Sequence, residues 1–278
     1  MNTKGPKLNQ FPLGNIKMPF RILILGPSQS GKTSTCKEIL YTFRDVPTVM
    51  VMNRTEMSNP KYRGHVPDIL IHEKYDNDAM SGLMDNQEEK CHHRSKGKVI
   101  DTRAIAVYDD LQSTAKEWGR SEITTRLATA GRNIDTSWIC LFQTPIVKGI
   151  EADIREQFTH VFIYPFDGQK EKAKVREYYC DLLTQRELDS LFNEHLDKYE
   201  CLVYDRTKGA KAPLLEKLFF MRSNNDLPAF RVCHPDWWRL NASVYDPNYK
   251  EREIQQRKQQ AQAKRGRGEL GLRKIAQH

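Results

Sequence analysis

One segment near the N-terminus constrains this 278-residue chain more than any other feature. Residues 22–25 read Ile-Leu-Ile-Leu, residues 26–33 read Gly-Pro-Ser-Gln-Ser-Gly-Lys-Thr, and a helical pattern continues over residues 34–40. The two glycines allow a tight loop whose backbone N–H groups converge on an anion, and the helix N-terminus adds the positive end of its dipole. The pattern is G-x-x-x-x-G-K-[ST], the phosphate loop, so the segment predicts binding of a nucleoside triphosphate.

Two side chains at the start of the helix carry the most specific chemistry of this loop. Lys32 is predicted to reach the β- and γ-phosphates, and the Thr33 hydroxyl is predicted to ligate Mg²⁺. Further nucleotide contacts are expected from the rest of the loop and the next helical residue, namely Gly26, Pro27, Ser28, Gln29, Ser30, Gly31 and Ser34. The predicted cofactors are therefore ATP and Mg²⁺.

A second apolar run ends in two aspartates. Residues 104–108 precede Asp109 and Asp110, and a continuous apolar run of this length is typical of a parallel strand buried on both faces. Ligands of open α/β sheets bind at the C-terminal ends of such strands. Asp109 is expected to hold Mg²⁺, and Asp110 to orient or deprotonate the attacking water. The alternative is that the pair only starts a turn or caps the next helix.

The residues that follow favour one class of NTPase over others. A GTPase would carry D-x-x-G after the acidic strand and an N-K-x-D motif, whereas Leu111 follows Asp110 and no N-K-x-D occurs in the sequence. A small nucleotide kinase normally lacks an acidic pair here. The next predicted strand, residues 138–142, ends at Gln143, whose amide is expected to sense the γ-phosphate and align water. The alternative for Gln143 is an ordinary polar residue at a strand end.

Positive charge is concentrated at the C-terminus. The formal net charge is +8, of which residues 250–278 contribute +6, from nine Lys or Arg against three Glu. These residues have too few apolar side chains to fold alone, so they are predicted to form a disordered tail that binds a polyanion, with a solubilising tail as the alternative. The predicted organisation is an extended arm over residues 1–16, an ATPase domain over residues 17–249, and this tail.

Other sequence patterns limit the possible fold class and the cellular location of the protein. No apolar run approaches the roughly 18 residues of a membrane span, and the N-terminus lacks an apolar signal segment, so an intracellular protein is expected. Alternating strand and helix patterns, with late strands at residues 201–204 and 218–221, predict an α/β fold with a mostly parallel central sheet flanked by helices. A helix is predicted after Thr184, because Glu187 completes a capping box.

Two further stretches resemble a known family. Residues 17–21, Lys-Met-Pro-Phe-Arg, and residues 131–137, Gly-Arg-Asn-Ile-Asp-Thr-Ser, are similar to the DNA-packaging ATPases of large double-stranded DNA viruses, including the poxvirus one. These belong to the FtsK–HerA group of DNA-pumping ATPases. The resemblance covers residues 17–225 and implies a P-loop NTPase fold with strand order 5-1-4-3-2, assembly into rings, and movement of duplex DNA by ATP hydrolysis.

The resemblance implies roles residue by residue. Lys32 and Thr33 match the phosphate-loop pair, and Asp109 matches the Mg²⁺-holding acid. Asp110 matches the catalytic acid and Gln143 the sensor. The family's catalytic acid is commonly Glu, so Asp110 is one methylene shorter.

The family also uses an arginine that acts in the neighbouring subunit of the ring. It usually falls between the acidic strand and the sensor strand, where this chain has Arg120, Arg126 and Arg132. Arg132 is favoured among them. Asn133 follows it, where a poxvirus-like member is expected to have His.

The sequence therefore predicts an ATP-driven motor that packages double-stranded DNA into a viral capsid. Its expected partners are the DNA, further copies of the chain and a viral capsid protein, with no membrane, and its expected place is the host cell during virus assembly or the virion. Alternatives are a DNA pump for plasmid or cellular DNA and a non-motor, nucleotide-dependent switch that binds nucleic acid. Charge alone offers Arg54, Lys61 and Arg63, or residues 90–98, as DNA-contacting groups.

Overall fold

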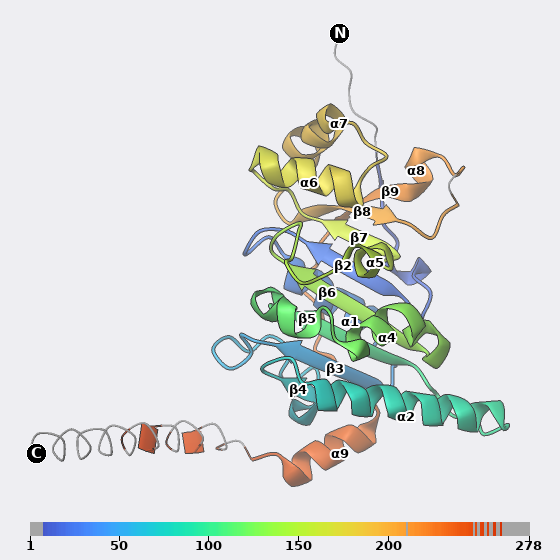
Figure 1. Ribbon diagram of the computed structural model, residues 1–278, viewed down its shortest axis with the longest axis vertical. Helices are drawn as coiled ribbons and strands as arrows, with labels where there is room; N and C mark the ends of the chain where they lie inside the picture. The colour runs from blue at the N-terminus through green and yellow to red at the C-terminus, as the bar shows by residue number, and fades with distance from the viewer. Residues whose placement is uncertain are drawn as a thin grey trace, which may run out of the picture. The chain divides into compact units, whose positions relative to one another are not determined.

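A single mixed sheet carries the chain's motifs, and the strand before the phosphate loop lies in its middle (Figure 1). In this computed structural model the described residues are 8–246 without residue 210, together with residues 248, 251, 252, 255, 258, 259 and 262. Nine strands within them pair in the order β1-β9-β8-β7-β2-β6-β5-β3-β4. They are β1 (Asn9–Gln10), β2 (Arg21–Leu25), β3 (Thr48–Asn53), β4 (Ile71–His72), β5 (Ala104–Asp109), β6 (Thr136–Phe142), β7 (His160–Ile163), β8 (Glu200–Asp205) and β9 (Leu218–Arg222).

Helices occupy many of the connections between strands. They are α1 (Lys32–Thr42), α2 (Asn77–Ser95), α3 (Ala115–Trp118), α4 (Glu122–Ala130), α5 (Ala152–Glu156), α6 (Gln169–Tyr179), α7 (Gln185–Ser190), α8 (Leu214–Lys217) and α9 (Pro235–Val244). Short 3₁₀ or π turns are η1 (Leu13–Asn15), η2 (Asp68–Leu70), η3 (Gln112–Thr114), η4 (Gly131–Ile134) and η5 (Leu191–His195). None of the described helices is both long and apolar enough to cross a bilayer.

Contacts divide the chain into two units, Met1–Trp238 and Arg239–His278. The whole sheet belongs to the first unit. In the second, the six described residues beyond residue 250 have helical backbone. Most of residues 250–278 lie outside the described part of the chain, so the disordered, DNA-binding tail stays a prediction.

The five central strands have the order that the resemblance implied. Numbered along the chain from the phosphate-loop strand, with the short β4 left out of the count, β7-β2-β6-β5-β3 is 5-1-4-3-2, and all neighbours in this group are parallel. The sheet is wider than five strands. A parallel β4 lies beside β3, while β8 and β9 continue beyond β7 with antiparallel pairing and β1 pairs parallel with β9. The predicted mostly parallel α/β sheet is confirmed. The predicted order named five strands, whereas the described sheet has four more at its two edges.

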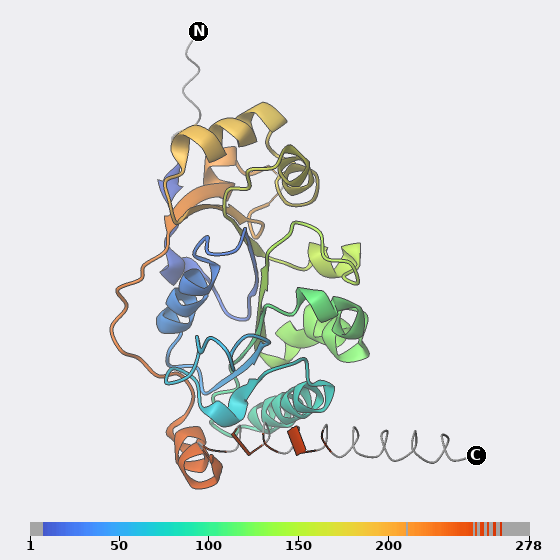
Figure 2. The same ribbon diagram turned by 90° about the vertical axis from the view of Figure 1, so that its left-hand side faces the viewer.

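Both faces of the sheet are covered by helices, which explains the continuous apolar runs in the sequence (Figure 2). Leu23 and Leu25 of β2 point into one core, which also contains apolar residues of α2, α4 and α6. Ile22 and Ile24 point into the other core, where they pack with residues of α1 such as Ile39. Successive residues of a strand face opposite sides, so every residue of β2 is buried.

The elements expected from local patterns are largely confirmed. The runs at residues 22–25, 104–108 and 138–142 are β2, β5 and β6. The capping box is present: the Thr184 hydroxyl accepts from the Glu187 N–H at 3.3 Å, and the Glu187 carboxylate accepts from the Thr184 N–H at 2.8 Å.

Residues 223–234 leave β9 and cross the face of the sheet that carries α1. Phe230 packs on Tyr41 of α1 and stacks on His65, with ring centroids 5.4 and 4.4 Å apart. The N–H of Val232 donates to the His65 carbonyl at 2.9 Å. The N–H of Cys233 donates to the Val46 carbonyl at 3.2 Å, just before β3. This segment, which we call the strap, therefore joins the antiparallel end of the sheet to its β3 end (Figure 2).

The arm predicted over residues 1–16 contacts the sheet through residues 9–11 of its described part. Asn9 and Gln10 pair with β9, and Phe11 is buried with its ring against three others, those of His160, Phe162 and Phe219. An apolar anchor of this size removes enough surface from water to hold a short segment in place.

We predict that Phe11→Ala lowers the free energy of unfolding by about 3–5 kcal/mol, because it empties a buried aromatic site. Urea denaturation followed by tryptophan fluorescence measures the change. Gln10→Ala, on the exposed side chain next to it, is the matched control and should change stability by less than about 0.5 kcal/mol. Equal effects of the two variants would show that the N-terminal segment is not part of the core.

Candidate active site

The phosphate loop connects β2 to α1, at the edge of the sheet where the parallel strands end. Gly31 has a φ of 113°, a left-handed conformation that favours glycine. At Gly26 the constraint is space, because a Cβ atom there would lie 2.5 Å from the Cβ of Tyr164. The two glycines of the motif are thus required for different reasons, one for conformation and one for its close contact with the residue after β7.

The side chain of Lys32 points back toward the phosphate loop, and its ammonium group contacts the backbone of that loop. Its Nζ donates to the carbonyls of Gly26 and Pro27, at 2.8 and 2.5 Å. The side chain is almost fully buried, and burial lowers the pKa of Lys32 to about 8. The Ser30 hydroxyl is buried without a hydrogen-bond partner in the described residues. A bound phosphate would place negative charge beside the buried ammonium group of Lys32.

Asp109 and Thr33 meet at the N-terminus of α1, as predicted for a Mg²⁺ site. The Thr33 hydroxyl donates to Oδ2 of Asp109 at 3.3 Å, and the Tyr62 hydroxyl donates to the same oxygen at 2.9 Å. Burial raises the pKa of Asp109, while Lys61, with Nζ 3.6 Å from Oδ2, and Tyr62 lower it. A hydroxyl and a carboxylate are hard oxygen ligands of the kind that Mg²⁺ uses beside nucleotide phosphates, so these residues fit the ion.

Asp110 and Gln143 form the second predicted pair. Asp110 has a φ of 55°, a conformation that Asp adopts more readily than most residues. The Gln143 amide donates to Oδ1 of Asp110 at 3.1 Å. The backbone N–H of Gln143 donates to the side chain of Gln112, in η3, at 2.8 Å. Gln143 is therefore joined to both Asp110 and the segment that follows it.

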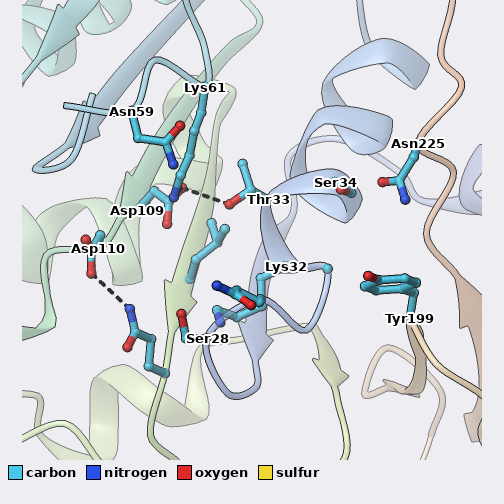
Figure 3. A pocket seen from close by; sticks show the side chains of 14 residues that line it. Ser28, Lys32, Thr33, Ser34, Asn59, Lys61, Asp109, Asp110, Tyr199 and Asn225 are labelled. Carbon is cyan, nitrogen blue, oxygen red and sulfur yellow. Dashed lines mark hydrogen bonds and ion pairs between the residues drawn. The ribbon is translucent and has the colours of Figure 1, made fainter. Parts of the chain in front are cut away.

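These groups line one cavity of about 450 Å³ (Figure 3). Its walls come from the phosphate loop and α1, from the ends of β5 and β6, and from three segments that the motifs do not include. The lining residues are Ser28, Gln29, Gly31, Lys32, Thr33, Ser34, Asn59, Lys61, Asp109, Asp110, Leu141, Gln143, Tyr199 and Asn225. Three of the residues predicted to contact the nucleotide are not among those that line the cavity: Gly26, Pro27 and Ser30.

The loop after β3 is one of the three segments of the site that lie outside the motifs. Glu56 is fully buried, and its carboxylate accepts hydrogen bonds from the backbone N–H groups of Lys61, Tyr62 and Arg63, at 2.9 to 3.1 Å. The Asn53 amide donates to it at 2.7 Å. We call residues 56–63 the Glu56 loop. Sequence reasoning considered Lys61 only as a DNA contact, whereas its Nζ lies beside Asp109 in the nucleotide cavity.

Arg132 lies away from this cavity. It belongs to η4, which precedes β6, whereas Gln143 follows the C-terminal end of that strand. A seven-residue strand spans about 23 Å, so Arg132 cannot reach its own site. Its neighbour is Arg21 at the start of β2, whose pKa falls to about 10 through burial and the charge of Arg132.

The other two arginines form ion pairs within the chain. The Nε of Arg120 lies 3.0 Å from Glu151. Arg126 pairs with Asp85 and Glu88 of α2. Of the three candidate arginines, Arg132 is the one without an ion pair among the described residues.

Comparison with known proteins decides the family. A family model described as the poxvirus A32 protein matches residues 10–172, more than half of the chain. The chain belongs to the poxvirus A32 family. This match contains the phosphate loop, both acidic residues and Gln143, and this A32-family protein is an ATPase.

Two viral proteins are similar to this chain at low sequence identity. Uncharacterized protein L437 of Acanthamoeba polyphaga mimivirus is 23% identical over 257 residues, which cover 90% of this chain and 88% of that protein. Uncharacterized protein 075L of Invertebrate iridescent virus 6 is 22% identical over 208 residues, which cover 73% of this chain and 76% of that protein.

Two solved structures show the fold. The genome packaging NTPase B204 from Sulfolobus turreted icosahedral virus 2, in complex with sulfate, has a TM-score of 0.52 and 13% identity, covering 76% of this chain and 100% of its own. The pCW3 conjugation coupling protein TcpA, with ATPγS, has a TM-score of 0.53 and 16% identity, covering 74% of this chain and 60% of its own. The A32-family protein thus has the P-loop NTPase fold.

We predict that Glu56→Gln lowers the free energy of unfolding by about 1.5–3 kcal/mol, the scale of hydrogen bonds to a charged group. A glutamine must place its NH₂ group against either the Asn53 amide or the backbone N–H groups of the loop, and all of these are donors. Urea denaturation measures the stability. Exposed Glu117→Gln is the matched control, and a loss no larger than in that control would contradict the role of the carboxylate.

Proposed function

We propose that this protein is the motor of a viral genome-packaging machine, a homo-oligomeric ring that hydrolyses ATP to move double-stranded DNA into a capsid. The observation that carries the proposal is the Asp110–Gln143 pair, held beside the phosphate loop in a chain of the poxvirus A32 family. Support also comes from the fold shared with a protein described as a genome packaging NTPase. The proposal places the protein in the host cell during virus assembly, with a capsid protein as a further partner.

The chain's own residues divide the work of hydrolysis. Lys32 moves from the loop carbonyls to the β- and γ-phosphates, where its charge offsets the charge that develops on the transferred group. Asp110 accepts the proton of the attacking water, and the Gln143 amide fixes the orientation of that carboxylate. Thr33 and Asp109 would hold Mg²⁺, which would neutralise charge on the phosphate oxygens.

Gln143 also connects hydrolysis to movement. Its amide and backbone link Asp110 to Gln112 in η3. Departure of the γ-phosphate would change the partners of the amide and so shift the segment between β5 and α4. That segment contains Arg120, which pairs with Glu151 in the loop after β6. This segment would carry the change at the phosphate to the surface of the subunit.

We predict that Lys32→Ala abolishes ATP hydrolysis and weakens ATP binding. Asp110→Asn should retain ATP binding but turn over roughly 10²-fold more slowly, the scale of a lost general base. Steady-state phosphate release and equilibrium binding of ATPγS separate the two effects. Exposed Asp181→Asn is the matched control and should behave as wild type. Normal turnover of Asp110→Asn would remove this residue from the mechanism.

The motor itself is tested with wild-type protein. Specific ATPase activity should rise with protein concentration and with linear duplex DNA, and electron microscopy with ATPγS and DNA should show rings. Activity that depends on neither concentration nor DNA would favour the nucleotide-dependent switch. Rings that translocate duplex DNA but bind no capsid protein of the same virus would favour a DNA pump of another kind.

We further propose that Arg132 acts in the neighbouring subunit. It is exposed, lacks an ion pair in the described residues and is too far from its own cavity to act there. Such arginines contribute on the order of 10³-fold or more to the rate. Arg132→Ala subunits mixed with Lys32→Ala subunits should therefore recover activity, since some interfaces then pair an intact Lys32 with an intact Arg132.

Two matched mixtures complete this test. Arg120→Ala and Arg126→Ala replace Arg132→Ala, each mixed with Lys32→Ala subunits, and co-assembly is verified by pull-down of one tagged variant. Recovery with Arg120→Ala alone would transfer the role to Arg120. An absence of recovery in every mixture would indicate that none of the three acts between subunits.

A further inference from the structure

The nucleotide cavity has a second end, away from the acidic residues. Tyr199 and Asn225 line it, on the side of the phosphate loop opposite Asp109 and Asp110 (Figure 3). Tyr199 immediately precedes β8, and Asn225 lies just beyond β9. Both strands belong to the antiparallel extension, and Glu200 pairs with Arg222, so the two residues reach the same edge of the sheet.

Tyr199 is held in an unfavourable conformation that presents its ring to this cavity. Its φ is 68°, which is uncommon for an aromatic residue and strains the backbone. The side chain is 37% exposed, although large aromatic rings usually gain from burial. The Tyr199 carbonyl accepts from the N–H of Ser223 at 3.1 Å, which fixes the backbone here. The ammonium of Lys198 lies over one ring face, 5.0 Å from the centroid, so a stacked ligand would use the opposite face.

Hydrogen bonds tie this end of the cavity directly to the phosphate loop. The Ser223 hydroxyl contacts that of Thr35 in α1 at 2.9 Å and the Gly31 carbonyl at 3.4 Å. The N–H of Asn224 donates to the Glu38 carboxylate, also in α1, at 2.9 Å. Tyr199 and Asn225 are therefore held at a set position relative to the group that binds the phosphates.

The chemistry of hydrolysis indicates what lies at this end. Water attacks the γ-phosphate in line with the oxygen that leaves, so the rest of the nucleotide points away from the water. Asp110 places the water on one side of the phosphate loop, and the nucleoside must leave toward the other. That is the side on which Tyr199 and Asn225 lie.

We propose that Tyr199 and Asn225 form the base subsite of the nucleotide cavity, a step that rests on the proposed ATPase function. The Tyr199 ring stacks on the purine, and the Asn225 amide, which carries one donor side and one acceptor side, pairs with the edge of adenine. This assigns a binding role to two residues that lie outside every sequence motif of the chain.

The test compares two ligands that share the phosphates but not the base: ATPγS and inorganic tripolyphosphate, each with Mg²⁺. Isothermal titration calorimetry gives both affinities for full-length wild type, Tyr199→Asn and Tyr199→Phe. Asn tolerates a positive φ, so Tyr199→Asn removes the ring with little backbone strain. Its affinity for ATPγS should fall roughly 5- to 100-fold, the scale of one base–aromatic stack, with tripolyphosphate binding unchanged. Tyr199→Phe keeps the ring and should bind as wild type.

Asn225→Ala tests the recognition of the base edge. Its affinity for ATP should fall about 5- to 10-fold while its affinity for GTP changes less, so the preference for adenine shrinks. If Tyr199→Asn leaves ATPγS binding unchanged, or weakens ATPγS and tripolyphosphate binding equally, the base subsite is wrong while the ATPase proposal stands. If wild-type protein binds neither ligand, the proposed function itself fails.

Discussion

The buried carboxylate of Asp109 is the point on which the site depends. Burial raises its pKa, so its charged form needs donors, and these come from separate parts of the chain. Thr33 comes from α1, while Lys61 and Tyr62 come from the Glu56 loop. A single desolvated charge thus fixes the phosphate loop, the end of β5 and the loop after β3 relative to one another.

The motif part of the site could be predicted because it follows from two local rules. An apolar run followed by a polar residue marks the end of a buried strand, and adjacent parallel strands end at the same edge. β2, β5 and β6 are neighbours, so Lys32, Asp109, Asp110 and Gln143 had to meet. The order of the five central strands did not come from local patterns. It followed from the family resemblance, which also could not supply the four outer strands.

The remaining wall of the cavity could not be predicted, because its residues are positioned by pairing between distant segments. Lys61 reaches Asp109 only because Asn53 lies level with Asp109 in the β3–β5 register and Glu56 then folds the loop back. Tyr199 is positioned by the antiparallel strands β8 and β9. The short apolar runs of these strands do not indicate which strands they pair with. The two-residue β1 pairs with β9 without any periodic signal in the sequence. Arg132 stays a prediction, since its proposed partner is a site in another subunit.

The strap has a mechanical consequence. It begins at Ser223, which touches the phosphate loop, and it ends at Cys233 and His234, which are hydrogen-bonded to Val46 and Pro47 before β3. A pull on the chain beyond this point would load those main-chain bonds and the buried Val232 first. Only after they yield would tension reach the nucleotide cavity. These main-chain bonds therefore separate the nucleotide cavity from tension applied on the C-terminal side of the strap.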